Sequence, residues 1–195
     1  METLHIFKIA SEEWEFEQIH RLNYKTFVEE IPQHPRNPQQ TLVDKFHDEN
    51  TYLICLRGDR VVGMVAVRHE RPFSLDAKLQ KIETYLPPHQ SLCEFRLLAV
   101  EKNHRSPQVF QGIMLLLARY CESCGYDLAI MSGTLRQIKL YKHLGFVPFG
   151  PLDGDGQAQF QPMYLTFDAY TELKEGSEAF ASAPGLPDSA SKGKR

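Results

Sequence analysis

An acidic and a basic residue occur two positions apart in a segment that otherwise has the composition of a buried β-strand. Residues 92–100 read LCEFRLLAV, and successive side chains of a strand point to opposite faces. The alternation predicts two sets: Glu94, Arg96, Leu98 and Val100 on one face, and Phe95, Leu97 and Ala99 on the other. A carboxylate at such a position can act as a general base, or it can be a buried acid neutralised by Arg96. Glu101, at the edge of the following loop, is a weaker candidate for a base.

A phenol is the second group that could transfer a proton. Tyr141 lies in the run LYKHLGF at residues 140–146. It can donate its hydroxyl proton to a leaving group, or it can pack half-buried with the hydroxyl satisfied nearby. His104 and His143 are interpreted as exposed loop and helix residues.

The turn that follows residues 92–100 has the features of a phosphate-binding helix start. Ser106 and Pro107 are an N-cap and a first helical residue, and the helix predicted for residues 108–123 ends before Gly125. A helix N-terminus offers free backbone N–H groups and a partial positive charge to an anion, and Arg105 adds a cation. Pro107 has no N–H to offer, so a capped helix that binds nothing is the alternative.

The cysteines do not predict a metal site. Cys121 and Cys124 have the CxxC spacing, but the sequence contains no second ligand pair of the kind that a structural zinc site needs. We therefore expect no metal, and we expect the four cysteines to be reduced thiols.

The other elements are predicted from hydrophobic periodicity and turn residues. Strands are expected at residues 4–9, 51–57, 60–68 and 126–131, with a closing hairpin of 146–149 and 160–167. Helices are expected from Ser11 toward Glu30 and over 41–49, 75–86 and 136–144. The two residues Gly58 and Asp59 should close a hairpin between two of the strands.

Composition restricts the class of protein. The 195 residues carry 22 basic and 25 acidic side chains, a net charge of -3, which disfavours nucleic acid as a partner. No apolar run approaches the roughly 20 residues of a membrane span, and the N-terminus lacks the pattern of a signal peptide. We expect a cytoplasmic protein without stable membrane insertion, made of one domain at residues 1–170 and a disordered tail at 171–195, rich in Gly, Pro, Ser and Ala.

The element order and three motifs resemble the GNAT superfamily of N-acyltransferases. The motifs are the strand that ends Leu98-Ala99-Val100, the turn led by Arg105, and residues 140–146, which are similar to the superfamily's Leu-Tyr-x-x-x-Gly-Phe. The resemblance implies an α/β GNAT fold: a mixed, mostly antiparallel central sheet, splayed between the fourth and fifth strands, with helices on both faces. Residues 92–100 and 24–30 are further similar to the branch of N-acyl amino acid synthases and acyl-homoserine-lactone synthases.

The resemblance also implies site residues. Main-chain groups near Leu98 and Val100 would pair with the pantetheine arm of the donor, and Glu94 and Tyr141 would be the catalytic base and acid. The other donor-binding positions implied are Arg105, Gln108, Val109, Phe110 and Thr134. The superfamily's Arg-x-x-Gly-x-Gly loop is replaced here by a sequence without glycines.

The function implied is transfer of an acyl group from a phosphopantetheine thioester to the amine of a small molecule. The donor is acyl-CoA, acetyl-CoA or an acyl carrier protein. Residues 75–86 could form the wall of a long acyl pocket, in which case Leu79 and Ile82 would line it. Two alternatives stay open: an ordinary acetyl-CoA-dependent N-acetyltransferase, and a catalytically silent GNAT-fold sensor or scaffold. The sequence leaves a homodimer possible.

Overall fold

The computed structural model describes residues 4–154 and 159–170 of the chain. The disordered tail expected at residues 171–195 lies outside this part, and the domain boundary at residue 170 stays a prediction. Seven strands form one sheet in the order β1-β2-β3-β4-β5-β7-β6. Their bounds are β1 His5–Ile9, β2 Thr51–Arg57, β3 Arg60–Arg68, β4 Leu92–Val100, β5 Leu128–Thr134, β6 Val147–Pro148 and β7 Phe160–Thr166.

The sheet is mixed and mostly antiparallel, as expected. Every neighbouring pair is antiparallel except β4 and β5, which run parallel. The parallel pair needs a crossover, and the helix α2 (Pro107–Cys124) provides it. The predicted hairpin at Gly58 and Asp59 is confirmed, because β2 pairs directly with β3.

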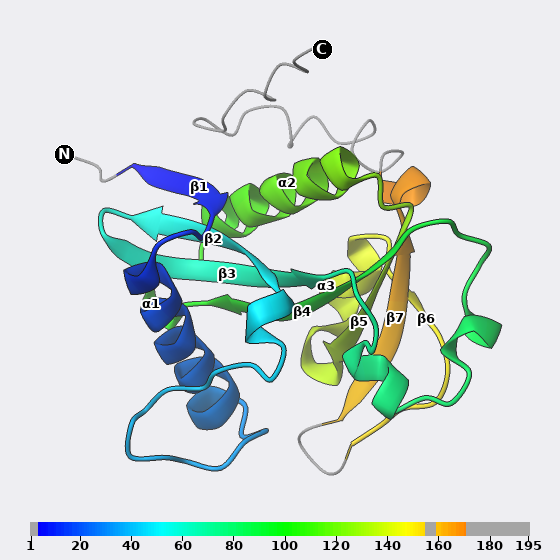
Figure 1. The fold of residues 1–195 in the computed structure, drawn as a ribbon, viewed down its shortest axis with the longest axis horizontal. Helices are drawn as coiled ribbons and strands as arrows, with labels where there is room; N and C mark the ends of the chain where they lie inside the picture. The colour runs from blue at the N-terminus through cyan, green and yellow to red at the C-terminus, as the bar shows by residue number, and fades with distance from the viewer. Residues whose placement is uncertain (1–3, 155–158, 171–195) are drawn as a thin grey trace.

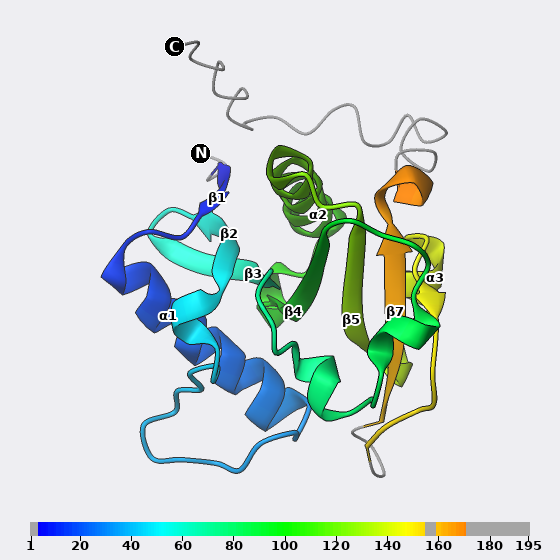
Figure 2. The same ribbon diagram turned by 45° about the vertical axis from the view of Figure 1, so that its right-hand side comes forward.

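Helices cover both faces of the sheet, and Figures 1 and 2 show α1 and α2 on opposite sides of it. The helix α1 (Glu13–Tyr24) buries Ile19 and Leu22 against one face, and α2 buries Ile113 and Leu117 against the other. The helix predicted toward Glu30 continues beyond α1 as a π-helix, η1 (Lys25–Glu30). Glu12 caps α1, in place of the predicted Ser11.

The sheet is splayed between β4 and β5. The two strands pair only from Leu92 opposite Leu128 to Phe95 opposite Met131. Beyond that point β4 continues with β3 as its partner, while β5 pairs with β7 as far as Thr134. The edge of β4 that faces β5 therefore has no strand partner after Phe95 within the described residues.

A β-bulge in β4 overturns the expected alternation of its side chains. Ala66 pairs with Arg96 but Met64 pairs with Ala99, so Leu97 and Leu98 together oppose one residue of β3. Leu97 has a φ of 54°, the left-handed conformation that such an extra residue adopts. Arg96 and Leu98 therefore do not share a face: Leu98 and Val100 pack on the α2 side, whereas Glu94 and Arg96 lie on the α1 side.

Residues 75–86 do not form the predicted helix. They form two short 3₁₀ turns, η3 (Ser74–Ala77) and η4 (Ile82–Tyr85), interrupted at Lys81, whose φ is 54°. Leu79 and Ile82 pack with Phe73 and Phe149 in a small separate core. The helical spacing of these apolar residues is satisfied equally by two turns wrapped around one cluster, and the pattern cannot distinguish the two arrangements.

The shorter predicted helices are only partly present. Residues 41–49 contain a single 3₁₀ turn, η2 (His47–Glu49), and the rest of this segment is irregular. Residues 136–144 contain a 3₁₀ turn, η6 (Leu135–Gln137), followed by the helix α3 (Ile138–His143). A final 3₁₀ turn, η5 (Lys102–His104), connects β4 to α2.

Candidate functional site

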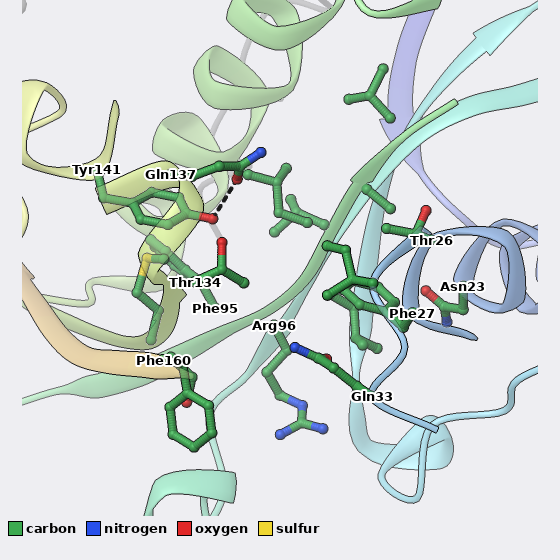
Figure 3. A pocket seen from close by; sticks show the side chains of 18 of the residues that line it. Asn23, Thr26, Phe27, Gln33, Phe95, Arg96, Thr134, Gln137, Tyr141 and Phe160 are labelled. Atoms are coloured by element: carbon green, nitrogen blue, oxygen red, sulfur yellow. Dashed lines mark hydrogen bonds between the residues drawn. The ribbon is translucent and has the colours of Figure 1, made fainter. Parts of the chain in front are cut away.

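A cleft of about 1730 Å³ follows the unpaired part of β4 on both sides of the strand. One wall, from α2, α3, β5 and β7, is mostly apolar and includes Phe110, Met114, Leu117, Met131, Phe146 and Leu165. The other wall, from α1, η1 and two loops, carries most of the polar groups and includes Asn23, Thr26, Asp44, Ser74, Lys78 and Arg96. Figure 3 shows the two walls separated by the β4 ribbon. The cleft can hold a molecule with an apolar part on one side and a polar part on the other.

Tyr141, the predicted catalytic acid, lines this cleft. It projects from α3, is buried, and donates a hydrogen bond of 2.8 Å to Gln137 Oε1 (Figure 3). Burial raises the pKa of Tyr141 above its ordinary value near 10, and a hydrogen bond with Thr134 opposes that rise. The phenol therefore keeps its proton at neutral pH and is available as an acid.

The position of Tyr141 depends on a glycine of β5. A Cβ added at Gly133 would lie 2.9 Å from Tyr141 Cδ2 and 3.0 Å from Met163 Sδ. Both distances are shorter than an ordinary van der Waals contact. Gly133 thus leaves the space that the tyrosine ring occupies. The neighbouring Thr134, which the resemblance implies as a donor-binding residue, lines the cleft.

The predicted phosphate-binding turn is built as a capped helix start. Ser106 Oγ accepts a hydrogen bond of 3.4 Å from the Val109 N–H, as expected of an N-cap. Arg105 and Phe110 line the cleft, whereas the side chains of Gln108 and Val109 do not. The Gln108 side chain is exposed, and the Val109 side chain belongs to the core.

Arg105 already has two partners in this structure. Its Nε donates to the Val100 carbonyl at 3.1 Å, and its guanidinium pairs with Glu30. The Arg105 and Glu30 side chains are 47% and 31% exposed, so the ion pair is largely solvated and contributes at most about 1 kcal/mol. A phosphate could replace the carboxylate. The Val100 carbonyl, a main-chain group predicted to pair with the donor, therefore already accepts one hydrogen bond, and its oxygen has a second lone pair for another.

Glu94 lies behind the polar wall of the cleft. Its side chain is fully buried and is absent from the cleft lining. The carboxylate accepts hydrogen bonds from the Ser74 N–H at 2.8 Å, the Leu75 N–H at 3.3 Å, and the Ser74 hydroxyl. Ser74 itself lines the cleft. Glu94 and Tyr141, the two predicted catalytic residues, are therefore not brought together directly.

Arg96 connects two buried carboxylates. It donates to Asp44 at 2.7 Å and to Glu94 at 3.4 Å, and its guanidinium carbon lies 4.8 Å from the ring centre of Phe46. The three charged side chains are each less than 12% exposed. This arrangement agrees with the interpretation that Glu94 is neutralised by Arg96. Arg96 lines the cleft, and its buried Nε has no partner among the described residues.

Several cleft residues were missed by sequence reasoning, three of them with buried polar side chains on the polar wall. Asn23, Thr26 and Asp44 line the polar wall and are all buried or nearly so. A signal existed for the first two, because Asn23 and Thr26 fall on the same helical stripe as Ile19, where an apolar residue is expected. Nothing in the sequence marks Asp44, which lies in an irregular loop.

The described residues offer neither a metal centre nor a membrane span. Within residues 4–154 and 159–170, no three His, Cys, Asp or Glu side chains are grouped so that they could hold a metal ion. In the same ranges, no helix has the length and apolar character needed to cross a bilayer.

Comparison with known proteins places these features in a family. Residues 18–166 match the protein family described as N-acyl amino acid synthase FeeM. No curated protein sequence matches the chain. Among solved structures, the CoA-dependent acyl-homoserine lactone synthase BjaI, in complex with MTA, is similar with a TM-score of 0.74 and 20% identity over 91% of this chain and 92% of BjaI.

Two further structures share the fold. FeeM, an N-acyl amino acid synthase from uncultured soil microbes, has a TM-score of 0.70 and 14% identity, covering 88% of this chain and 96% of FeeM. The acyl-homoserine lactone synthase LasI has a TM-score of 0.68 and 15% identity, covering 85% of this chain and 91% of LasI. The likeness confirms the expected GNAT fold.

Proposed function

Because the chain belongs to the family of the N-acyl amino acid synthase FeeM, we propose that it transfers the acyl group of an acyl-CoA to the α-amine of an amino acid. The family fixes the reaction class: the protein is an acyltransferase, which moves an acyl group from a thioester to an amine. Small molecules are its substrates. The proposal adds the identity of the donor, the class of the acceptor and the residues that act.

The observation that carries the proposal is the free edge of β4 beside the cleft. An extended chain with amide groups can pair with such an edge as an added strand would, and the pantetheine arm is a chain of this kind. Leu98 and Val100 belong to this edge, next to the apolar wall. An arm lying there would direct its thioester toward Tyr141 and its phosphates toward Arg105 and the start of α2, including Gln108, Val109 and Phe110.

The apolar wall favours a donor with a long acyl chain. Phe110, Met114 and Leu117 line it from α2, and Met131 and Leu165 line it from the sheet. Each methylene buried there would stabilise the bound donor by about 0.8 kcal/mol. We assign the acyl chain to this wall and not to residues 75–86, because Leu79 and Ile82 do not line the cleft.

Proton transfer from the amine follows a short relay. The acceptor amine loses a proton as it attacks the thioester carbonyl, and the departing sulfur gains one from Tyr141. Glu94 is the proposed base, acting through Ser74, whose hydroxyl lines the cleft and donates to the carboxylate. The amine proton passes to Ser74 Oγ while the Ser74 proton passes to Glu94. The step leaves Glu94 protonated and Tyr141 as a phenolate, and both return to their starting states when Glu94 releases a proton to water and Tyr141 takes one up.

Replacing Ser74 tests the relay. Ser74→Ala removes the only hydroxyl of that residue and should lower turnover by about 10²-fold, the lower end of the range for general base catalysis. Ser74→Thr keeps a hydroxyl and should retain most of the activity. Equal turnover of the Ala and Thr variants, measured at saturating substrates, would contradict the relay.

Arg105 is proposed to bind the donor phosphates. Arg105→Ala should weaken acyl-CoA binding by about 1.5 to 3 kcal/mol, and the remaining affinity should depend less on salt. The matched control is Glu30→Gln, which removes the carboxylate that competes for the same guanidinium and should not weaken donor binding. Titration calorimetry with acyl-CoA at two salt concentrations measures both variants. If Arg105→Ala binds acyl-CoA as tightly as the native protein does, the turn serves only to cap the helix.

The function itself is tested by direct assay. Purified protein is incubated with acetyl-, octanoyl- or hexadecanoyl-CoA and each of the protein amino acids, and products are identified by mass spectrometry. We expect one N-acyl amino acid and free CoA, with a longer chain preferred over acetyl. A preference for acetyl would favour an ordinary acetyltransferase. Transfer from an acylated carrier protein in place of each acyl-CoA would identify that protein as the donor.

A further inference from the structure

Two buried oxygen atoms of residues that line the cleft, on one helical turn, have no hydrogen-bond partner among the described residues. They are Asn23 Oδ1 and Thr26 Oγ1. The two side chains are 0% and 4% exposed, and both line the polar wall of the cleft, where Figure 3 shows them next to Phe27. Buried polar atoms are nearly always satisfied, so two adjacent unsatisfied ones require an explanation.

The local backbone brings the two oxygens to the same side. Asn23 and Thr26 are three residues apart, a spacing that places side chains on one face of a helix. Thr26 belongs to the π-helix η1, a wide helical turn of a kind that occurs frequently at functional sites. The amide of Asn23 is oriented by its own Nδ2, which donates to the Leu42 carbonyl at 3.4 Å. Its Oδ1 is therefore the atom left for a ligand.

The chemistry of these atoms selects the group that they can hold. An amide oxygen can only accept a hydrogen bond, and a hydroxyl oxygen can also accept one. The partner missing from Asn23 Oδ1 must therefore carry an N–H or O–H donor, and the Thr26 hydroxyl can accept from the same group. Two acceptors side by side suit a group with at least two donors, and a primary amine has them.

We propose that Asn23 Oδ1 and Thr26 Oγ1 form the socket that receives the amino group of the acceptor, an inference that rests on the acyl transfer proposed above. The oxygens are neutral, so they hold the amine without the full negative charge that would keep it protonated as an ammonium ion. A neutral amine is the form that attacks a thioester. Asp44, a buried carboxylate of this wall, is instead engaged by Arg96, as is Glu94 behind the wall. Glu29 and Glu30 of η1 also line the cleft; the Glu29 side chain is exposed, and Glu30 pairs with Arg105.

The unpartnered Arg96 Nε supplies the complementary half of the socket. This nitrogen is a buried donor, and its residue lines the same wall. A carboxylate oxygen of the acceptor would satisfy it. The wall thus presents two acceptors for an amino group and one donor for a carboxylate, the pattern of a free α-amino acid.

The test compares Thr26→Val, which keeps the branched shape and removes the hydroxyl, with Thr26→Ser, which keeps the hydroxyl. The acceptor is the amino acid that gives the fastest transfer by the native protein. We expect Thr26→Val to raise its KM by about 5- to 100-fold, the range for leaving one buried N–H donor of the neutral amine unsatisfied, with the KM for acyl-CoA unchanged. Thr26→Ser should stay within about threefold of the native protein.

A second readout separates recognition of the amine from a structural role. The des-amino analogue of the acceptor, in which hydrogen replaces the amino group, is used as a competitive inhibitor. It cannot use the socket, so its inhibition constant should be the same for the native protein and for Thr26→Val. A structural defect would weaken the binding of the amino acid and of its analogue equally, and that result would overturn the inference.

A charged variant at the other position gives an independent check. Asn23→Asp places a carboxylate against the amine and should keep it protonated, so the rising limb of the kcat against pH profile should move to higher pH. An unmoved limb together with an unchanged acceptor KM in both variants would show that the two oxygens hold only water. If the native protein acylates none of the amino acids tested, the proposed function fails and the socket fails with it; transfer that is insensitive to both substitutions overturns the socket alone.

Discussion

Tyr141→Phe should lower turnover by about 10²-fold or more while leaving donor binding nearly unchanged. The substitution keeps the ring and removes the hydroxyl that faces the cleft and donates to Gln137. Without that proton donor the sulfur must leave as an unprotected thiolate, and general acid catalysis contributes roughly 10²- to 10⁴-fold. Single-turnover rates with acyl-CoA, together with calorimetric donor affinities, separate the chemical step from binding.

The control for this prediction changes the position of the phenol and keeps it intact. Gly133→Ala introduces a Cβ 2.9 Å from the Tyr141 ring, so the ring must shift. We expect reduced turnover in this variant too. The ultraviolet titration of Tyr141 should still be present, which shows that the phenol is intact. Full activity of Tyr141→Phe would mean that water protonates the sulfur and that Tyr141 serves only in packing.

Arg96→Ala should destabilise the protein by about 3 to 5 kcal/mol. Arg96 is the cation that Asp44 and Glu94 share, and the two carboxylates are 8% and 1% exposed. Removal of one partner from a buried ion pair leaves the other charge without compensation, which accounts for a cost of this size. Urea denaturation followed by circular dichroism gives the free energy of unfolding of the native protein and the variant.

Two variants set the scale for this effect. Arg60→Ala breaks a pair with Glu101 in which the arginine is 56% exposed, so its cost should stay below about 1 kcal/mol. Arg96→Lys retains the charge but lacks the planar guanidinium that contacts both carboxylates. We expect an intermediate loss in the free energy of unfolding. Equal stability of Arg96→Ala and Arg60→Ala would show that the buried triad contributes nothing beyond a surface pair.

Much of the fold could be predicted from local signals. The β2–β3 hairpin follows from Gly58 and Asp59, and the start and end of α2 follow from Ser106, Pro107 and Gly125. Each of these signals acts within a few residues, through a turn conformation or a cap. The splay between β4 and β5 was also expected, but through resemblance to a superfamily and not from the residues themselves.

The failures occurred where distant contacts override a local pattern. The alternation of residues 92–100 predicted that Arg96 and Leu98 share a face, and one extra residue at Leu97 separates them. A bulge of this kind is decided by the pairing with β3, which the sequence of β4 alone does not contain. Residues 75–86 were predicted as a helix because their apolar spacing fits one, yet the cluster around Phe73 and Phe149 is better filled by two turns.

By itself the sequence determined which side chains are candidates for the chemistry, and the tertiary structure decided which of them meet. Tyr141, Arg105 and Thr134 were found from motifs, and all three line the cleft. Glu94 was found as well, but its carboxylate is turned behind Ser74, a residue 20 positions away. Asn23 and Thr26 look like ordinary interruptions of an apolar stripe until α1 is packed against β4. The physical reason is that side-chain chemistry is local, whereas burial and the supply of hydrogen-bond partners are fixed only when distant segments pack together.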